Sequence, residues 1–304
     1  MLLTKQNAYY LVFFLSGVVV GILSYHTTYI QIPAEVETKT VYKAPKPIEQ
    51  NQQVVTVPMQ ERRVPSKQED WSKVSCPLEP LDADQWNLYL HLTTISIRCT
   101  FKASFGGSFH KVYFYGEKWI CLDRRLDMKP NNCTMLSFGI GADWTFDDEI
   151  DKLFGCKVYA FDPTIGKPNH NRSDNIMFFN LGIGAPRKNG RGTVDSYQNI
   201  LKLLKLENSV IDYLKIDVEG AEYPFFEDVL NTTPNLLKNV KQIGMEIHLS
   251  GNAERAWKYV QKLDCLGFKI MSYNFNPVYA VPVYKGRQIQ DLLEIVWIRN
   301  DNWR

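Results

Sequence analysis

The stretch that most constrains the fold covers residues 212–222 and reads DYLKIDVEGAE. With the two residues before it, its first half is an apolar run rich in β-branched residues, about as long as a buried strand. Asp217 and Glu219 come where this strand should end, Gly220 permits a sharp turn, and a helix is expected over 221–230. A strand followed at once by a helix is the unit from which parallel α/β sheets are built.

The two carboxylates at this strand end have two interpretations. Ligands of open α/β sheets bind beyond the carboxyl ends of the strands, so Asp217 and Glu219 indicate a binding or catalytic site. The same pair can instead serve only the following helix, whose N-terminus attracts negative charge. The other motifs of the chain favour the first interpretation.

From residue 133 onward, apolar strand-like runs alternate with amphipathic helix-like segments. This rhythm predicts a doubly wound, mostly parallel α/β sheet. The last two strands are compatible with an antiparallel closing pair. Strands are expected over 134–138, 157–161, 176–181, 210–218, 240–247, 268–273 and 292–298, and helices over 143–154, 194–206, 221–230 and 253–266.

A glycine turn follows the first of these strands, with Gly139 and Gly141 one residue apart, and Asp162 ends the next strand. Glycines at a strand-to-helix turn let a ligand approach the backbone, and an acid about twenty residues later is placed to bind ribose hydroxyls. Tight-turn geometry alone also explains each feature. Together they indicate a dinucleotide or S-adenosylmethionine, and the run GIGADW lacks the third glycine that a nicotinamide-binding turn requires.

Near the N-terminus, residues 8–25 contain no charged side chain. This segment is long enough to cross a bilayer as a helix. No A-x-A-like site follows, so an uncleaved anchor is favoured over a signal peptide. A stem rich in Pro, Lys, Glu and Gln comes next. The expected divisions are a short cytosolic tail over 1–8, a transmembrane signal-anchor over 9–30, a flexible stem over 31–70, an N-terminal extension over 71–130 and the main α/β domain over 131–304.

Two features favour a type II protein whose folded domain lies in the lumen of the Golgi or another secretory compartment. N-glycosylation sequons begin at Asn132, Asn171 and Asn231, and six cysteines form an even set that is compatible with disulfides. Their spacing shows no CxxC pair, so no structural zinc site is expected. A net charge of +2 gives no sign of a nucleic-acid partner. Nothing in the sequence indicates an oligomeric state.

The N-terminal extension is expected to pack on the main sheet. Apolar residues at helical spacing predict a helix over 78–98. The alternating run KVYFYGEKWICL predicts a hairpin over 111–122, with its turn at Gly116 and Glu117.

Three strings in order resemble the FkbM-type class I methyltransferases: TVDSY at 193–197, DYLKIDVEGAE at 212–222 and MEIH at 245–248. The stretch SFGIGADWTFDDE at 137–149 resembles the animal, membrane-anchored, methyltransferase-like branch of that family. The resemblance covers about 136–248. It implies a seven-stranded, Rossmann-like sheet with one antiparallel strand, S-adenosylmethionine as cofactor, and O-methyl transfer.

Site residues follow from this resemblance. Gly139 and Gly141 would face the methionine part of the cofactor, Asp162 would bind the ribose, and Asp217 and Glu219 would lie beside the transferred methyl group. Such families usually have an acidic residue at position 137 and a glycine at position 143, where this chain has Ser and Asp.

Methyl transfer to a hydroxyl benefits from a base that accepts the proton. His248 or Asp217 is the expected base, Glu219 would orient the acceptor, and both Glu246 and His248 would line the same cleft. Hard oxygen ligands suit Mg²⁺, so Asp217, Glu219 and Glu246 leave a divalent ion open, although no metal site is assigned.

The acceptor is expected to be a glycan or glycoconjugate hydroxyl in the secretory pathway. A small molecule or a protein is the alternative acceptor. A further alternative is a catalytically silent binding module, because Ser137 and Asp143 change the usual cofactor turn.

Overall fold

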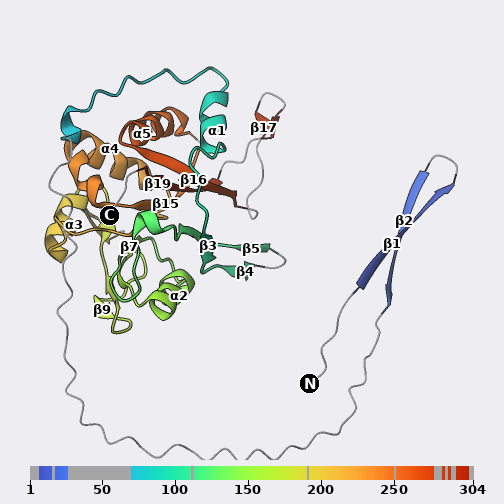
Figure 1. Cartoon of the computed structure of the whole chain (residues 1–304), viewed down its shortest axis with the longest axis horizontal. Helices are drawn as coiled ribbons and strands as arrows, with labels where there is room; N and C mark the ends of the chain where they lie inside the picture. The colour runs from blue at the N-terminus through green and yellow to red at the C-terminus, as the bar shows by residue number, and fades with distance from the viewer. Residues whose placement is uncertain are drawn as a thin grey trace, which may run out of the picture. The chain divides into compact units, whose positions relative to one another are not determined.

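The computed structural model describes residues 7–15, 18–26, 70–110, 113–189, 192–249, 251–276, 283–284, 287–288 and 292–300 (Figure 1). The chain divides into two compact units, Met1–Thr56 and Val57–Arg304. In the first unit, β1 (Asn7–Leu15) pairs antiparallel with β2 (Val18–His26). No helix among the described residues is long and apolar enough to cross a bilayer. The transmembrane anchor therefore stays a prediction, and the stem at 31–69 lies outside the described residues.

The second unit is built around an eight-stranded sheet in the order β16-β19-β15-β14-β7-β8-β10-β9. Strands β10, β8, β7, β14 and β15 run parallel, and β19 runs antiparallel to β15 and β16. The mixed, mostly parallel sheet is thus confirmed, with the short edge strand β9 as an eighth member. Bounds are β7 Thr134–Phe138, β8 Lys157–Phe161, β9 His170–Asn171, β10 Ile176–Phe179, β14 Tyr213–Ile216, β15 Gln242–His248, β16 Phe268–Phe275 and β19 Leu292–Arg299.

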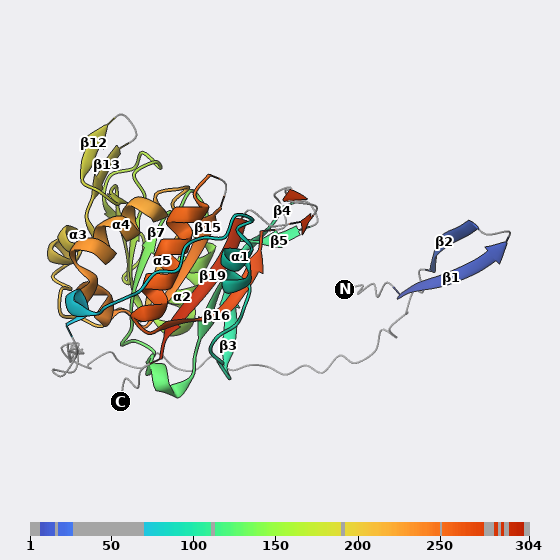
Figure 2. The same ribbon diagram turned by 90° about the horizontal axis from the view of Figure 1, so that it is seen from above.

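Helices cover both faces of this sheet, as a doubly wound fold requires (Figures 1 and 2). On one face, residues of α1, α3, α4 and α5 share a hydrophobic cluster with the strands. On the other face, α2 packs with β3 and β6 in a second cluster. Bounds are α1 Trp86–Leu92, α2 Thr145–Phe154, α3 Tyr197–Leu204, α4 Glu222–Thr232, α5 Ala253–Cys265, β3 Lys102–Phe105 and β6 Lys118–Cys121.

The N-terminal extension differs from its predicted elements. The helix expected over 78–98 is reduced to α1, because Gln85 before it has a left-handed φ of 55° and the chain leaves the helix at Thr93 and Thr94. Both threonine hydroxyls donate to backbone carbonyls four residues earlier, which competes with helical hydrogen bonding.

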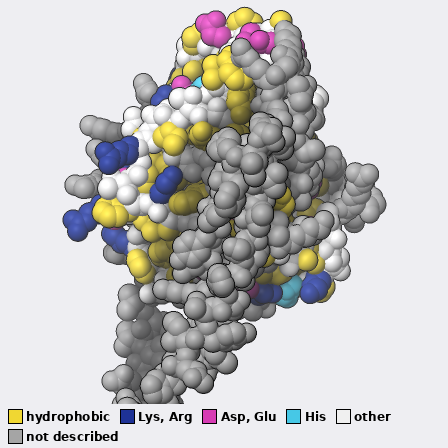
Figure 3. Space-filling view, turned by 90° about the vertical axis from the view of Figure 1, so that its right-hand side faces the viewer, with side chains coloured by type: hydrophobic (Ala, Val, Ile, Leu, Met, Phe, Trp, Pro, Cys, Tyr) yellow, Lys and Arg dark blue, Asp and Glu magenta, His cyan; other side chains and the backbone are white. Residues whose placement is uncertain are grey.

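The hairpin expected over 111–122 is also wrong. β4 (Ser108–His110) pairs with β5 (Tyr113–Tyr115), while β3 pairs with β6, so β5 and β6 do not pair with each other. Gly116, with φ +86°, lies between β5 and β6 instead of forming a two-strand turn. Phe109, Tyr113 and Phe114 of this extension are exposed. Figure 3 shows one face of the molecule, on which hydrophobic side chains (yellow) are exposed next to Lys and Arg side chains (dark blue).

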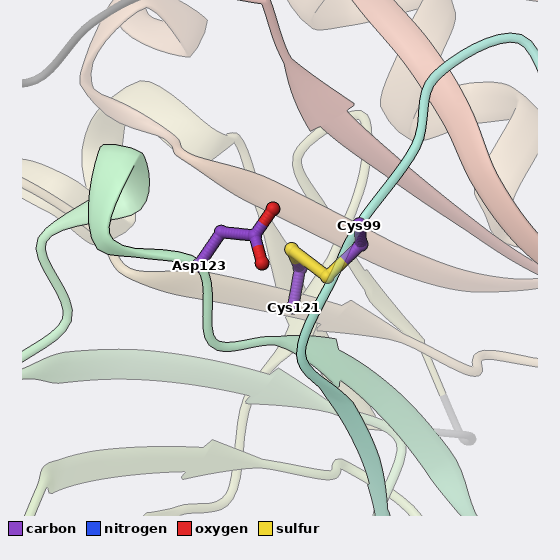
Figure 4. A group of neighbouring side chains, drawn as sticks. All are labelled: Cys99, Cys121 and Asp123. Carbon is purple, nitrogen blue, oxygen red and sulfur yellow. A yellow bond between two sulfur atoms is a disulfide. The ribbon is translucent and has the colours of Figure 1, made fainter.

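All six cysteines pair, in the disulfides Cys76–Cys265, Cys99–Cys121 and Cys133–Cys156. Cys76–Cys265 closes a loop of 189 residues and ties the extension to α5, which restricts the unfolded chain. Cys99–Cys121 joins the segment before β3 to β6, beside the Asp123 carboxylate (Figure 4).

Short elements complete the unit. Residues 182–183, 187–189 and 192–195 form a three-stranded sheet in the order β11-β13-β12. The remaining bounds are β11 Gly182–Ile183, β12 Arg187–Asn189, β13 Gly192–Asp195, β17 Val283–Tyr284, β18 Arg287–Gln288, η1 Trp71–Lys73, η2 Arg124–Leu126 and η3 Pro234–Asn239.

Candidate functional site

A cavity of about 890 Å³ lies at the carboxyl ends of β7, β8 and β14. Its size falls within the range of small-molecule and cofactor sites. Six candidate site residues named from the sequence line it together: Gly139, Gly141, Asp162, Asp217, Glu219 and Glu246. Adjacent parallel strands bring their carboxyl ends to one edge of a sheet, which explains why residues far apart in the sequence meet here.

The two glycines of the turn after β7 have different roles. A side chain at Gly139 would place its Cβ 1.5 Å from the backbone oxygen of Asp217, so glycine is required for β7 and β14 to end side by side. At Gly141, with φ +58°, an added Cβ would meet no atom within 4 Å. The turn therefore presents open backbone to the cavity at Gly141, as a cofactor turn must.

Asp162 is buried at the end of β8 and organises the turns on both sides of it. Its Oδ2 accepts hydrogen bonds from the backbone N–H groups of Ile140 (3.0 Å) and Gly141 (2.7 Å). Its Oδ1 accepts from the N–H (2.7 Å) and hydroxyl (2.6 Å) of Thr164. A carboxylate offers about four acceptor positions, so the side chain is saturated in this arrangement. Asp162 holds the glycine turn in place, and its contact with a ribose stays a prediction.

Asp217, at the end of β14, is kept ionised by two lysines. Lys118 Nζ lies 3.1 Å from Asp217 Oδ2, and Lys215 Nζ lies 3.9 Å away and donates to the Gly139 carbonyl. Burial opposes the charge on Asp217, but Lys118 and then Lys215 outweigh it and lower the pKa of this carboxyl. Lys118 is itself buried, and Asp217 and Glu294 outweigh its burial and raise its pKa.

Glu246 stands next to Asp217 because of the sheet register. Ile216 of β14 pairs with Met245 of β15, so the residues that follow them, Asp217 and Glu246, are neighbours. On the other side of β15, Glu246 pairs directly with Glu294 of β19. Burial, then Asp217 and Glu294, raise the pKa of Glu246 to about 8. Asn276 Nδ2 donates to Glu246 Oε1 at 3.3 Å. Asp217, Glu246 and Glu294 all line the cavity, so three carboxylates share its inner wall.

His248 does not line the cavity, unlike the expectation from the sequence. It contacts Glu219 and Glu246, which do line it, and its Nδ1 lies 3.2 Å from Glu222 Oε1. The hydrogen bond with Glu222 is the largest cause that raises the pKa of His248 to about 9, against burial and together with the charges of Glu222, Glu246 and Glu219. A protonated imidazole cannot accept a proton, so the structure does not favour His248 as the base.

Ser137 and Asp143, the two residues that differ from the usual cofactor turn, lie in different surroundings. Ser137 is buried in β7, and Asp147 of α2 is buried without a hydrogen bond of normal geometry to either oxygen. Burial raises the pKa of Asp147 to about 6, although Lys215 favours its charge. Asp143 is exposed on the cavity wall, and its Oδ1 accepts from the Thr145 N–H (2.9 Å) at the start of α2.

The sequence interpretation missed Lys118, Glu294 and Asn276. Glu294 has a usable signal, because it is a single charge inside the strongly apolar run LLEIVWI, whereas Lys118 follows Glu117 at the start of KWICL. Buried charges are almost always paired, so Glu294 predicted a cationic partner without saying which one. Asn276 follows β16 and carries no such signal.

Comparison with known proteins agrees with this geometry. A family described as "Methyltransferase domain" matches residues 59–280 of this chain. Probable methyltransferase-like protein 24 of Homo sapiens is 25% identical over 185 residues, which cover 56% of this chain and 49% of that protein. The Rattus norvegicus protein of the same name is 28% identical over 139 residues, 43% of this chain and 38% of that protein. The chain thus spans about half or less of the length of these curated relatives.

Solved structures give weaker likenesses. Precorrin-6y C5,15-methyltransferase from Geobacter metallireducens GS-15 shows a TM-score of 0.32 at 12% identity, covering 58% of this chain and 85% of that one. The human methyltransferase 10 domain containing protein shows 0.31 at 13% identity, covering 55% and 71%. At these TM-scores the assignment rests on the sequence match. Because that match spans well over half of the chain, the protein belongs to a methyltransferase-domain family.

Proposed function

We propose that the protein is an S-adenosylmethionine-dependent methyltransferase whose cofactor occupies the cavity at the ends of β7, β8 and β14. The observation that carries this proposal is the glycine turn, which opens onto the cavity at Gly141 and faces the carboxylates at the end of β14. Membership of a methyltransferase-domain family supports the same cofactor. When bound, the cofactor would supply a methyl group carried on a sulfonium sulfur. After transfer of the methyl group, the rest of the cofactor is a neutral thioether.

The chain's own residues hold the reactants and receive the proton. The turn at Gly139 and Gly141 borders the methionine part, and the segment after Asp162 borders the ribose. Asp217 accepts the proton of the acceptor hydroxyl, because Lys118 keeps it ionised and it lines the cavity. A low pKa does not impair this role, since the hydroxyl becomes strongly acidic as its oxygen gains the methyl group. Glu219, 77% exposed at the cavity edge, orients the acceptor.

The proposed reaction is O-methylation of a glycan or glycoconjugate hydroxyl by a type II membrane protein of the Golgi or a related compartment. Three disulfides support an oxidising compartment, and the sequon residues Asn171 and Asn231 are exposed. The strings TVDSY, DYLKIDVEGAE and MEIH support an FkbM-type enzyme, and the stretch SFGIGADWTFDDE supports its membrane-anchored branch. A small-molecule or protein acceptor is the alternative.

Calorimetric titration of the purified full chain with S-adenosylmethionine and S-adenosylhomocysteine tests the cofactor. We expect micromolar binding that Asp162→Ala abolishes, because the glycine turn loses its anchor. Asp123→Ala is the matched control: Asp123 also accepts backbone N–H bonds, from Thr100 and Phe101, but lies outside the cavity lining. Well-folded wild-type protein that binds neither compound would overturn the proposal.

The second candidate is a catalytically silent binding module. Two observations favour it: Ser137 and Asp143 replace the usual acid and glycine, and the Asp162 carboxylate is saturated by protein donors. This candidate predicts an intact fold without cofactor binding in the same titration.

A further inference from the structure

Three potential metal ligands converge beside the cavity from two elements. Glu246 and His248 are alternate residues of β15 and therefore point to the same face of the strand. Glu219 reaches them from the turn between β14 and α4. One ligand atom of each lies within 4.8 Å of the others, with His248 Nε2 3.3 Å from Glu219 Oε2 and 3.7 Å from Glu246 Oε2.

A buried carboxylate orients the imidazole of this group. Glu222 Oε1 lies 3.2 Å from His248 Nδ1, which leaves Nε2 directed at Glu219 and Glu246. The Glu222 side chain is 2% exposed, and its Oε2 has no hydrogen-bond partner. Metal-bound histidines almost always donate their second ring N–H to a carboxylate, a backbone carbonyl or a water, and Glu222 is placed to be that acceptor. Asn276 likewise binds Glu246 Oε1 and leaves Oε2 facing His248.

We propose that Glu219, Glu246 and His248 bind a divalent cation, with Glu222 as the carboxylate that orients His248. The set differs from the one left open by the sequence, because Asp217 is engaged by Lys118 and Lys215 while His248 takes its place. The site does not depend on the proposed function.

Local charge supports a cation at this place, where it would replace the proton that the surrounding carboxylates favour on His248. Glu219, Glu222 and Glu246 surround one imidazole, and in the described part of the chain no Lys or Arg nitrogen lies within 4.0 Å of their oxygens. Glu219 also has a φ of 51°, a conformation that is uncommon for non-glycine residues and that clusters at active sites and ligand clamps.

The donor set indicates the kind of ion. Two carboxylates and one imidazole suit Mn²⁺ or Zn²⁺ better than Ca²⁺, which prefers oxygen ligands alone. Glu219 is exposed, so the remaining coordination positions face solvent and the cavity. An ion there would stand where it can polarise an acceptor oxygen, a general role of metals with open positions.

In the described part of the chain, Cys99, Cys121 and Asp123 form a second group of potential ligands that lie close to one another (Figure 4). This group is not suited to bind an ion. Its cysteines form a disulfide and so offer no thiolate. Asp123 accepts hydrogen bonds from the backbone of Thr100 and Phe101.

Electron paramagnetic resonance of Mn²⁺ added to chelator-treated full chain, without any methyl donor, tests the proposal. We expect one saturable ion per chain with micromolar affinity. His248→Gln and Glu246→Gln should weaken binding at least 100-fold, and Glu222→Gln about 10- to 100-fold. His170→Gln, which changes a histidine bonded to the Pro168 carbonyl, is the matched control and should leave affinity unchanged.

Circular dichroism identifies variants that fail to fold. Glu219→Gln changes only an exposed side chain, so it keeps the test decisive if His248→Gln unfolds. The absence of saturable binding, or binding that folded Glu219→Gln and Glu246→Gln variants retain, would overturn the site. A chain that binds Mn²⁺ but no S-adenosylmethionine would overturn only the proposed function, and the reverse result would overturn only the cation site.

Discussion

Asp212 and Asp217 lie at the two ends of the same buried strand, β14, and their surroundings differ in charge balance. At the first end, Lys241 Nζ lies 2.8 Å from Asp212 Oδ1, and Asp212 Oδ2 accepts from the Thr134 N–H at 2.9 Å. Asp217 shares Lys118 with Glu294 and stands beside Glu246. Both ends carry buried charge, but at the cavity end three carboxylates (Asp217, Glu246 and Glu294) meet two lysines, Lys118 and Lys215. This imbalance, more than burial, distinguishes a candidate site from a structural ion pair.

Lys241→Met should give the largest effect on stability. It removes the ammonium group that pairs with the buried Asp212 carboxylate, and breaking a buried pair in this way costs about 3–5 kcal/mol. Urea unfolding followed by circular dichroism measures the loss. The double variant Asp212→Leu/Lys241→Met should recover most of it, because both members of the buried pair are then replaced by apolar side chains. If the double variant is as unstable as the single one, Asp212 is not the source of the cost.

Asp147 sharpens the comparison, because it is a buried aspartate with no cation in hydrogen-bond contact. Its pKa of about 6 in the folded chain exceeds the ordinary value of 3.8, so folding favours the protonated form. Its contribution to stability is therefore fully present below pH 3.8 and is lost as the pH rises through 6. The cost above pH 6 is roughly 3 kcal/mol at 1.36 kcal/mol per pKa unit.

Asp147→Asn should consequently stabilise the protein at pH 8 by up to that amount and change little at pH 4. Urea unfolding at the two pH values measures the difference. Asp148→Asn, one residue along α2, is the comparison: its exposed carboxylate pairs with Arg172, so removing it should slightly destabilise the protein at pH 8 instead of stabilising it. Equal effects of Asp147→Asn at both pH values would mean that Asp147 is ionised throughout.

Lys118→Met should cost less than Lys241→Met, roughly 2 kcal/mol at pH 7, although Lys118 is equally buried. The carboxylates it leaves behind line the cavity, where water or a shared proton can stabilise them. The same unfolding measurement applies. A cost equal to that of Lys241→Met would show that the two ends of β14 are equally dry.

The sequence predicted the sheet well where local signals are complete. β7 and β8 match their expected bounds because each is a short apolar run that ends in a glycine turn or an aspartate. The glycine turn, Asp162, Asp217 and Glu219 meet as expected, since parallel neighbours end at one edge.

The parts that the sequence did not predict depend on long-range pairing. The register of the β3–β6 pair places Lys118 beside Asp217 and Glu294, across 99 and 176 residues of chain. Alternation in 111–122 cannot reveal this partner, because it predicts a strand but not what the strand pairs with. The carboxylate of Glu222 behind His248 was hidden for a similar reason, since a first-turn glutamate reads as a helix-capping residue.

The smallest effect is expected at an exposed pair, which sets the baseline for the two ends of β14. Arg172 forms two hydrogen bonds with Asp148, of 2.6 and 2.7 Å, and its guanidinium lies 4.4 Å from the centre of the Trp144 ring. The side chains of Arg172 and Asp148 are 34% and 47% exposed, and solvent therefore screens their attraction. Arg172→Gln should therefore cost about 1 kcal/mol, of which the ring contact supplies about half. Raising the salt concentration to 1 M should remove the ionic part of this difference while leaving the Lys241→Met cost nearly intact, because buried pairs are screened far less. If salt reduces both costs alike, water reaches Asp212, and the contrast between the two ends of the strand would lie in carboxylate number alone.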